Sequence, residues 1–195
     1  MSRLHTVDPA VAQGKAKELL DAVKAKMGAV PNLTRVMANS PAVLEAYLGF
    51  SGALAGGSSL GGRLREQIAL AVGQANGCEY CLAAHNFLAK RAGVDDDRRI
   101  ANRLGGDPEP KTDAALKFAR RLVERRGQVS DQDVAAVRDA GWSDAEIAEI
   151  VAETSLNVFT NWLNNTARTD VDFPAAPALE SEKPAAACGT GACGH

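Results

Sequence analysis

The sequence predicts an all-α protein, and three observations support that fold class. Apolar residues recur at helical spacing in almost every segment, and no run shows the sustained alternation of a half-buried strand. Glycine, proline or a serine cap separates the segments. The chain has 195 residues, of which 46% are hydrophobic and 24% charged, as in an ordinary globular domain. We therefore expect helices packed around a core, without a sheet.

The N-terminal part predicts three helices. They span residues 9–27, 31–37 and 41–54. Gly28 is the expected stop of the first helix, and Pro31 opens the second. Ser40 and Pro41 have the residue types of an N-cap followed by a first-turn proline, so they predict the start of the third helix. The glycines and serines of residues 55–59 then predict a flexible break.

The middle of the chain predicts three more helices. They span residues 60–75, 78–91 and 95–104. Asn76 and Gly77 form a tight-turn signal between the first two, and Gly93 is the expected end of the second. Because the connection is so short, we expect these two helices to fold back against each other.

After a loop at residues 105–110, the C-terminal part predicts three helices. They span residues 112–126, a segment that starts at Ser130, and residues 144–167. The pairs Ser130 with Asp133 and Ser143 with Glu146 have the pattern of a capping box. The last helix is apolar on more than one face, so it is expected to be a central core helix or part of an oligomer interface.

The sequence divides into a helical domain and a tail. We expect the domain to cover residues 1–169, with its core in residues 30–169. Residues 170–195 are rich in proline, alanine and glycine and predict a flexible tail. This tail ends with Cys188, Cys193 and His195.

Charge and hydropathy argue against several classes of partner. The net charge is -2 and aromatic residues make up 5%, so neither a basic surface nor a base-stacking platform for nucleic acid is expected. No run approaches the roughly 18 apolar residues of a membrane span, and the first residues lack the apolar stretch of a signal peptide. We expect no nucleic acid or membrane partner and a cytoplasmic location.

The four cysteines form two local pairs, Cys78 with Cys81 and Cys188 with Cys193. In a reducing compartment, close pairs indicate catalysis or metal binding rather than a disulfide scaffold. If a helix begins near Cys78, then Cys78, Cys81 and His85 lie at i, i+3 and i+7 and share one face. Both thiols then sit in the first helical turn, where the helix dipole lowers a thiol pKa.

Two more groups complete this candidate site. His85 is able to exchange a proton near neutral pH. Glu66 lies on the preceding helix, which the turn at residues 76–77 folds back beside His85, so it is able to orient the imidazole. Each of these residues has an alternative interpretation. The two cysteines are typical of half a zinc site, His85 of a surface histidine, and Glu66 of a solvated helix residue.

The pattern of Glu66, Cys78, Cys81 and His85 closely resembles the alkylhydroperoxidase D (AhpD) family of the carboxymuconolactone decarboxylase superfamily. The resemblance extends over about residues 30–175 and is greatest for the peroxidase-related members, which share the Asn-rich closing helix and the motif TDVDFP. It implies an AhpD-like helical bundle that assembles into trimers or hexamers.

The resemblance also implies roles. Cys81 would attack a hydroperoxide, Cys78 would form the disulfide, and His85 with Glu66 would relay protons. A dithiol or a thioredoxin-like protein would be the reductant, and no cofactor or metal is expected. The family's best-studied type has a histidine immediately before the second cysteine, where this chain has Tyr80, so a simpler relay is expected. Tyr80 is expected either to pack or to form a hydrogen bond near the site.

Other interpretations of the sequence stay open. The cysteines of the tail, Cys188 and Cys193, are expected to be an incidental feature, a tethered relay of electrons to the first pair, or a metal site with His195. The whole chain is expected to be a thiol peroxidase. Its alternatives are a disulfide reductase or adaptor for another peroxidase, a carboxymuconolactone decarboxylase-type lyase, and a redox-sensing or metal-binding oligomer.

Overall fold

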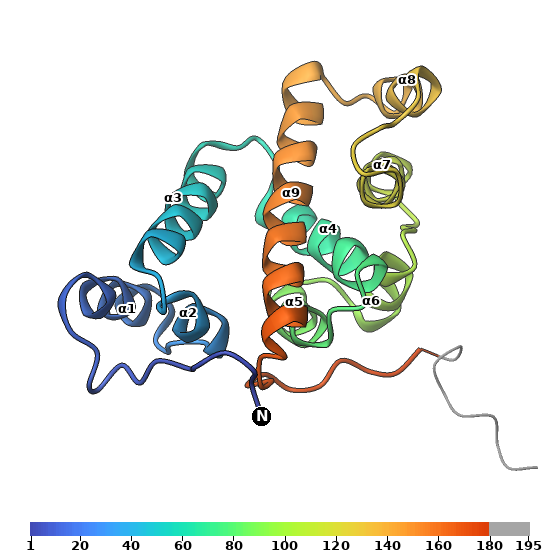
Figure 1. Cartoon of the computed structure of the whole chain (residues 1–195). Coiled ribbons are helices and arrows are strands. Elements are labelled where there is room, and N and C mark those ends of the chain that lie inside the picture. The colour runs from blue at the N-terminus through green and yellow to red at the C-terminus, as the bar shows by residue number, and fades with distance from the viewer. Residues whose placement is uncertain (180–195) are drawn as a thin grey trace, which may run out of the picture.

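Helix α9 is the axis around which the other helices are arranged in the computed structural model (Figure 1), which describes residues 1–179. Helices α1 to α3 lie on one side of α9 and α6 to α8 on the other, while α4 and α5 pack directly against it. The described residues contain helices and no strand, so the all-α prediction is confirmed for them. The helices are α1 (Gly14–Met27), α2 (Asn32–Met37), α3 (Pro41–Gly57), α4 (Gly62–Ala75), α5 (Glu79–Arg91), α6 (Asp96–Arg103), α7 (Pro110–Arg125), α8 (Asp131–Asp139) and α9 (Asp144–Ala167).

The sequence predicted the helix starts best where a side chain caps the helix. Ser130 and Ser143 both form complete capping boxes with Asp133 and Glu146, as predicted. Each serine side chain accepts a hydrogen bond from the N3 backbone, while the N3 carboxylate accepts one from the serine backbone. Local side-chain chemistry therefore determines these boundaries.

Two predicted boundaries are wrong. Helix α1 begins at Gly14 instead of residue 9, because Asp8 accepts backbone hydrogen bonds from residues 10–12 and closes a separate turn, after which Gln13 is extended. Helix α3 continues through Gly57, three residues into the predicted break at residues 55–59. These glycines have ordinary helical backbone angles, so only Ser58–Gly61 form the connection to α4.

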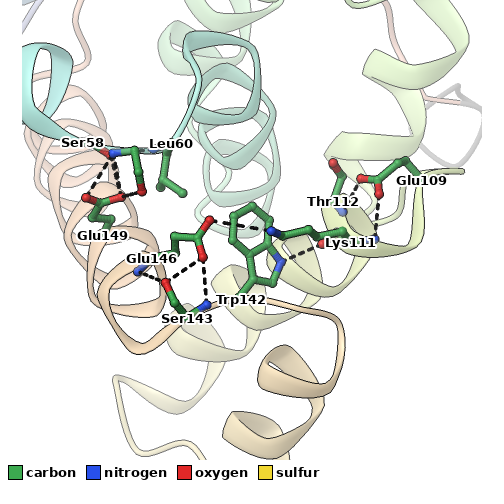
Figure 2. A network of polar contacts seen from close by, with 10 residues as sticks. Ser58, Leu60, Glu109, Lys111, Thr112, Trp142, Ser143, Glu146 and Glu149 are labelled. Carbon is green, nitrogen blue, oxygen red and sulfur yellow. Dashed lines mark hydrogen bonds and ion pairs between the residues drawn. The ribbon is translucent and has the colours of Figure 1, made fainter.

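Polar contacts hold the N-terminal end of α9 in place (Figure 2). Glu149 of α9 accepts hydrogen bonds from the Ser58 hydroxyl and from the backbone and hydroxyl of Ser59. These bonds join the C-terminal end of α3 to α9. The Trp142 indole donates to the Lys111 carbonyl at 2.9 Å, and the Lys111 ammonium lies 4.1 Å from the centre of the indole ring. These contacts position α9 relative to α3 and α7.

The core has two main parts. The first, which we call the aliphatic core, fills the space between α4, α7, α8 and α9 and includes Ile68, Leu116 and Ile150. The second, which we call the cysteine core, lies between α1, α2, α3 and α5 and contains Leu44, Cys78 and Cys81. Helix α9 borders both, so its two halves have different surroundings.

The described part of the predicted tail contacts the helical domain. Asp172 accepts a hydrogen bond from the backbone of Asn32, and the ring of Phe173 packs edge-on against Tyr80. Arg103 of α6 donates to the carbonyl oxygen of Pro177. Residues 170–179 therefore lie along the domain, whereas Cys188, Cys193 and His195 lie outside the described residues.

Membrane insertion finds no support among residues 1–179, since none of their helices has the length and apolar character required to cross a bilayer.

Candidate active site

The two cysteines lie at the start of α5, immediately after the tight turn from α4. Gly77 has a φ of 58°, a backbone angle that favours glycine, and this residue reverses the chain. Cys78 is the N-cap of α5, and its sulfur accepts a hydrogen bond from the Cys81 backbone N–H at 3.3 Å. The helix thus begins one residue later than the sequence predicted. Cys81 is its third residue, within the turn whose N–H groups favour an anion.

The two thiols differ in the direction in which their surroundings shift the pKa. The hydrogen bond from the Cys78 thiol lowers the pKa of Cys81, against the opposing effect of burial, and the positive charge of His85 lowers it further. The same hydrogen bond, together with burial, raises the pKa of Cys78. The sequence predicted a lowered pKa for both thiols, and for Cys78 this prediction is wrong because its proton is held between the two sulfurs. Of the two thiols, Cys81 is therefore the one that ionises more readily.

Glu66 and His85 meet as an ion pair between α4 and α5. The Glu66 carboxylate Oε2 lies 2.7 Å from Nδ1 of His85, and each side chain is 23% exposed. Burial lowers the pKa of His85, but the charge and hydrogen bond of Glu66 outweigh it, so the pKa of His85 is raised overall. The structure thus places the Glu66–His85 ion pair across α4 and α5, with the imidazole one turn from Cys81 and a raised pKa that favours its charged form.

Asparagines of α9 contact this site, and the sequence analysis did not assign them to it. Asn164 donates its side-chain N–H to the sulfur of Cys81 at 3.3 Å, and both residues are 2% exposed. Asn161, one turn earlier, also lowers the pKa of Cys81. One sequence signal was available: Asn157, Asn161 and Asn164 recur at helical spacing, interspersed with the apolar residues of the last helix.

Charged and polar groups surround the site on its other sides. Arg65 and Glu153 form an ion pair at 2.7 Å between α4 and α9, with the Glu153 side chain only 6% exposed. The carboxylate of Glu153 also accepts a hydrogen bond from Asn157. Burial, followed by the charges of Cys81 and Glu66, raises the pKa of the Tyr47 phenol to about 12. Tyr47 therefore stays a neutral hydrogen-bonding group at the edge of the site.

Tyr80, the residue between the two cysteines, is a packing residue that also forms a hydrogen bond. Its hydroxyl accepts a hydrogen bond from the backbone N–H of Leu33 at 3.2 Å, and its ring contacts Phe173. Burial raises the pKa of the Tyr80 phenol. Its side chain thus links α5 to α2 and to the segment after α9, in agreement with both roles that the sequence left open.

Two surface hollows lie near the ends of α9. A pocket of about 490 Å³ opens at the start of α5 and includes Gly77, Tyr80, Asn164 and Thr169 among its lining. A larger pocket of about 850 Å³ lies along α7 and α9, where Val158, Phe159 and Trp162 contribute apolar surface. Only the smaller pocket is lined by a residue that contacts the Cys81 sulfur, so it is the better candidate for access to the thiols.

A metal-binding group does not form in the part of the chain that the structure describes. Among residues 1–179, no three His, Cys, Asp or Glu side chains gather closely enough to hold an ion.

Comparison with known proteins relates this chain to one family. The model of the carboxymuconolactone decarboxylase family matches residues 41–125, which include both cysteines, Glu66 and His85. The predicted resemblance to AhpD-like proteins is confirmed. No curated protein matches the chain.

Solved structures with the same fold cover most of the chain. A peroxidase-related protein with an alkylhydroperoxidase AhpD core from Ralstonia eutropha JMP134 is 25% identical, with a TM-score of 0.78 over 88% of this chain and 92% of that chain. A peroxidase-related protein from Silicibacter sp. TM1040 is 23% identical, with a TM-score of 0.75 over 86% and 88%. The debrominase Bmp8, in complex with 2,3,4-tribromopyrrole, shares the fold at 18% identity, with a TM-score of 0.72 over 88% and 94%.

Proposed function

We propose that this chain, which contains an AhpD-like domain of the carboxymuconolactone decarboxylase family at residues 41–125, is a thiol peroxidase that reduces hydroperoxides. One observation carries the proposal: the pKa of Cys81 is lowered while that of Cys78 is raised. A two-cysteine peroxidase requires this division, because one sulfur attacks as a thiolate and the other keeps its proton until the second step. The ion pair of His85 with Glu66 adds a proton donor beside the nucleophile.

The first step oxidises Cys81. Its thiolate attacks the distal oxygen of the hydroperoxide, an S–O bond forms and the O–O bond breaks. The leaving alkoxide takes a proton from the imidazolium of His85, a charged form that its raised pKa favours. The products are an alcohol and a sulfenic acid at Cys81. Glu66 stabilises the charged imidazole before the transfer and holds the neutral ring afterwards.

The second step forms the disulfide. The sulfur of Cys78 attacks the sulfur of Cys81, the S–O bond breaks, and the oxygen leaves as water with the Cys78 proton and a second proton that the sulfenic acid already holds. The sulfur of Cys78 accepts a hydrogen bond from the Cys81 backbone, so the two residues are already close. An external dithiol or a thioredoxin-like protein then restores both thiols by thiol–disulfide exchange. The 490 Å³ pocket at the start of α5 is the approach that we assign to this reductant.

A homo-oligomer, a trimer or hexamer, is part of the same proposal. Apolar side chains remain exposed on α3 and α9, including Phe50, Phe159 and Trp162, of which Trp162 is 64% exposed. Helix α3 is strongly apolar, yet only Leu44 among its residues is buried. Contact with further copies would cover these surfaces. Light scattering coupled to size-exclusion chromatography tests this assembly, and a monomer at micromolar concentration would contradict it.

The decisive experiment for the activity follows peroxide and thiols together. Reduced protein is mixed with one equivalent of an alkyl hydroperoxide, and we expect the peroxide to disappear as two thiols per chain are lost. Turnover should then require an added dithiol. A Cys188→Ser, Cys193→Ser variant in parallel assigns the lost thiols to Cys78 and Cys81. Peroxide that persists for hours at micromolar protein would contradict the proposal.

The same pair of thiols also supports a disulfide reductase, the second candidate function. It differs because the protein would reduce a disulfide substrate at an appreciable rate while remaining slow with hydroperoxides. A parallel reaction with a protein disulfide tests the reductase. A second with 2,3,4-tribromopyrrole tests a debrominase like Bmp8, and a third with a small lactone tests a lyase. Loss of thiols with the protein disulfide alone or with the bromopyrrole alone would identify that reaction, whereas conversion of the lactone without loss of thiols would identify a lyase.

A further inference from the structure

Two asparagine amides of α9 converge on Cys81, and they are not equivalent. Asn164 donates to the Cys81 sulfur at 3.3 Å. The side chain of Asn161 is completely buried, and its oxygen accepts a hydrogen bond from the Asn76 amide at 2.9 Å. This hydrogen bond identifies which end of the Asn161 amide is the oxygen. The other end, the NH₂ group, remains available as a donor.

The remaining N–H group of Asn161 has no well-formed hydrogen bond among the described residues. It nevertheless lies near enough to Cys81 to influence the thiol. A buried donor without a partner costs on the order of 1–3 kcal/mol, so such a group is retained where an acceptor arrives during function. The spacing i and i+3 places both amides on the same face of α9, toward the start of α5.

We propose that Asn164 and Asn161 form an anion-binding pair for the reaction, in which Asn164 stabilises the Cys81 thiolate and Asn161 binds the oxygen transferred to it. This inference rests on the proposed peroxidase function and extends it to the groups that bind the reacting atoms. In the first step the charge moves from sulfur to the peroxide oxygens, and an amide N–H fixed beside the sulfur stabilises that charge. In the second step the same N–H stabilises the oxygen as the S–O bond breaks.

Asn76 is the positioning residue of this pair. It lies in the turn between α4 and α5, and its side chain links the carbonyl of Val72 to the oxygen of Asn161. Its own carbonyl accepts a hydrogen bond from Asn165. The turn that places the cysteines therefore also orients the Asn161 amide, so the nucleophile and the anion-binding pair share one support.

The test for Asn164 measures the thiolate directly. In a Cys78→Ser, Cys188→Ser, Cys193→Ser background Cys81 is the remaining cysteine, and ultraviolet absorbance reports its thiolate as pH changes. Asn164→Asp keeps the shape of the side chain but replaces the donor with an acceptor, so the thiolate fraction near neutral pH should fall about tenfold or more. An unchanged titration would overturn this half of the proposal, and the readout does not depend on any peroxide reaction.

The test for Asn161 compares two electrophiles. Asn161→Leu and Asn161→Asp both remove the N–H donor, and the second retains an oxygen for Asn76. The peroxide rate, expressed per thiolate, should fall by roughly 10²-fold in both variants, while the rate with iodoacetamide, which transfers no oxygen, should stay within about threefold. Equal loss with both electrophiles, or no loss with peroxide, would overturn the assignment.

A matched control lies on the same helix. Thr160 is buried, and its hydroxyl donates a hydrogen bond within α9, to the carbonyl of Asn157. Thr160→Val should leave both electrophile rates and the titration unchanged within about twofold. If the wild type proves inert to peroxide while Asn164→Asp still shifts the titration, the peroxidase function and the oxygen-binding role of Asn161 fail together, and the thiolate role of Asn164 stands.

Discussion

Each half of α9 contains a side chain with no exposed surface, and these two side chains differ in chemistry. In the N-terminal half, Ile150 has no exposed surface and packs into the aliphatic core with α4 and α7. In the C-terminal half, Asn161 is equally inaccessible, but it contributes an amide to the cysteine site and leaves one N–H group without a partner. The first position stabilises the fold by burying apolar surface. The second keeps a buried N–H group that has no hydrogen-bond partner among the described residues. Burial alone therefore does not identify the role of a residue on this helix.

Replacing the proposed nucleophile should have the largest effect on the reaction with peroxide. Cys81→Ser should lower peroxide consumption by roughly 10³-fold or more, since a hydroxyl in this position is not ionised near neutral pH. Cys78→Ser should instead permit the first step and leave a sulfenic acid at Cys81. Trapping with a dimedone probe, followed by mass spectrometry, locates that acid. A sulfenic acid on the other cysteine, in the matching Cys81→Ser protein, would reverse the two roles.

Removing the ion pair beside the thiol should have the next largest effect. Glu66→Gln and His85→Phe should each slow the peroxide reaction by about 10²-fold, because the alkoxide leaves without its proton donor. Each side chain is partly exposed, so the folded structure should persist, as circular dichroism would verify. Lys117→Gln, which removes an exposed charge on α7, is the control and should retain the wild-type rate. Rates near that of the wild type for both relay variants would leave the cysteines as the only reacting groups.

The comparison between the halves of α9 itself predicts different changes in stability. Ile150→Ala should lower the free energy of unfolding by about 2–5 kcal/mol, because it leaves a cavity in the aliphatic core. Asn161→Leu should change that free energy by less than about 1 kcal/mol, since the loss of the hydrogen bond from Asn76 is offset when the unpaired buried N–H group disappears. Urea denaturation measures both. A strongly destabilised Asn161→Leu protein would mean that the amide is structural.

The pH dependence of the first step should have two limbs. Cys81 reacts as a thiolate, and its lowered pKa predicts that the rate rises with pH through a range below that of an ordinary thiol. His85 acts while protonated, and its raised pKa predicts that the rate falls only when pH exceeds the usual histidine range. Stopped-flow rates across this range test both limbs. In Asn164→Asp the rising limb should move to higher pH, whereas the falling limb should move little.

The smallest expected effect concerns the second cysteine pair. If Cys188 and Cys193 relay electrons, replacing both by serine should slow recycling with a protein reductant by a few fold, because a tethered pair has an effective concentration in the millimolar range. The first peroxide turnover should stay the same, and a small dithiol should restore recycling. Equal recycling in both proteins would show that the pair is incidental to this reaction.

The helices could be predicted from the sequence more completely than the site could. Local signals were sufficient for most helices: the capping boxes at Ser130 and Ser143 predicted α8 and α9 correctly, and Asn76 with Gly77 predicted the turn before the cysteines. The spacing of Cys78, Cys81 and His85 predicted one shared face, and the neighbouring helix supplied Glu66. These features depend on residues close together in the chain or joined by one tight turn.

The difference between the two thiols depends on the tertiary structure, which lowers the pKa of Cys81 and raises that of Cys78. Asn164 lies 83 residues after Cys81 in the chain, and its amide reaches the sulfur only because α9 packs against α5. The same packing buries both thiols, so that desolvation and a shared proton raise one pKa while the other is lowered. Sequence spacing reports which groups share a helix face, but hydrogen bonding and desolvation at a buried sulfur depend on the helices that cover it.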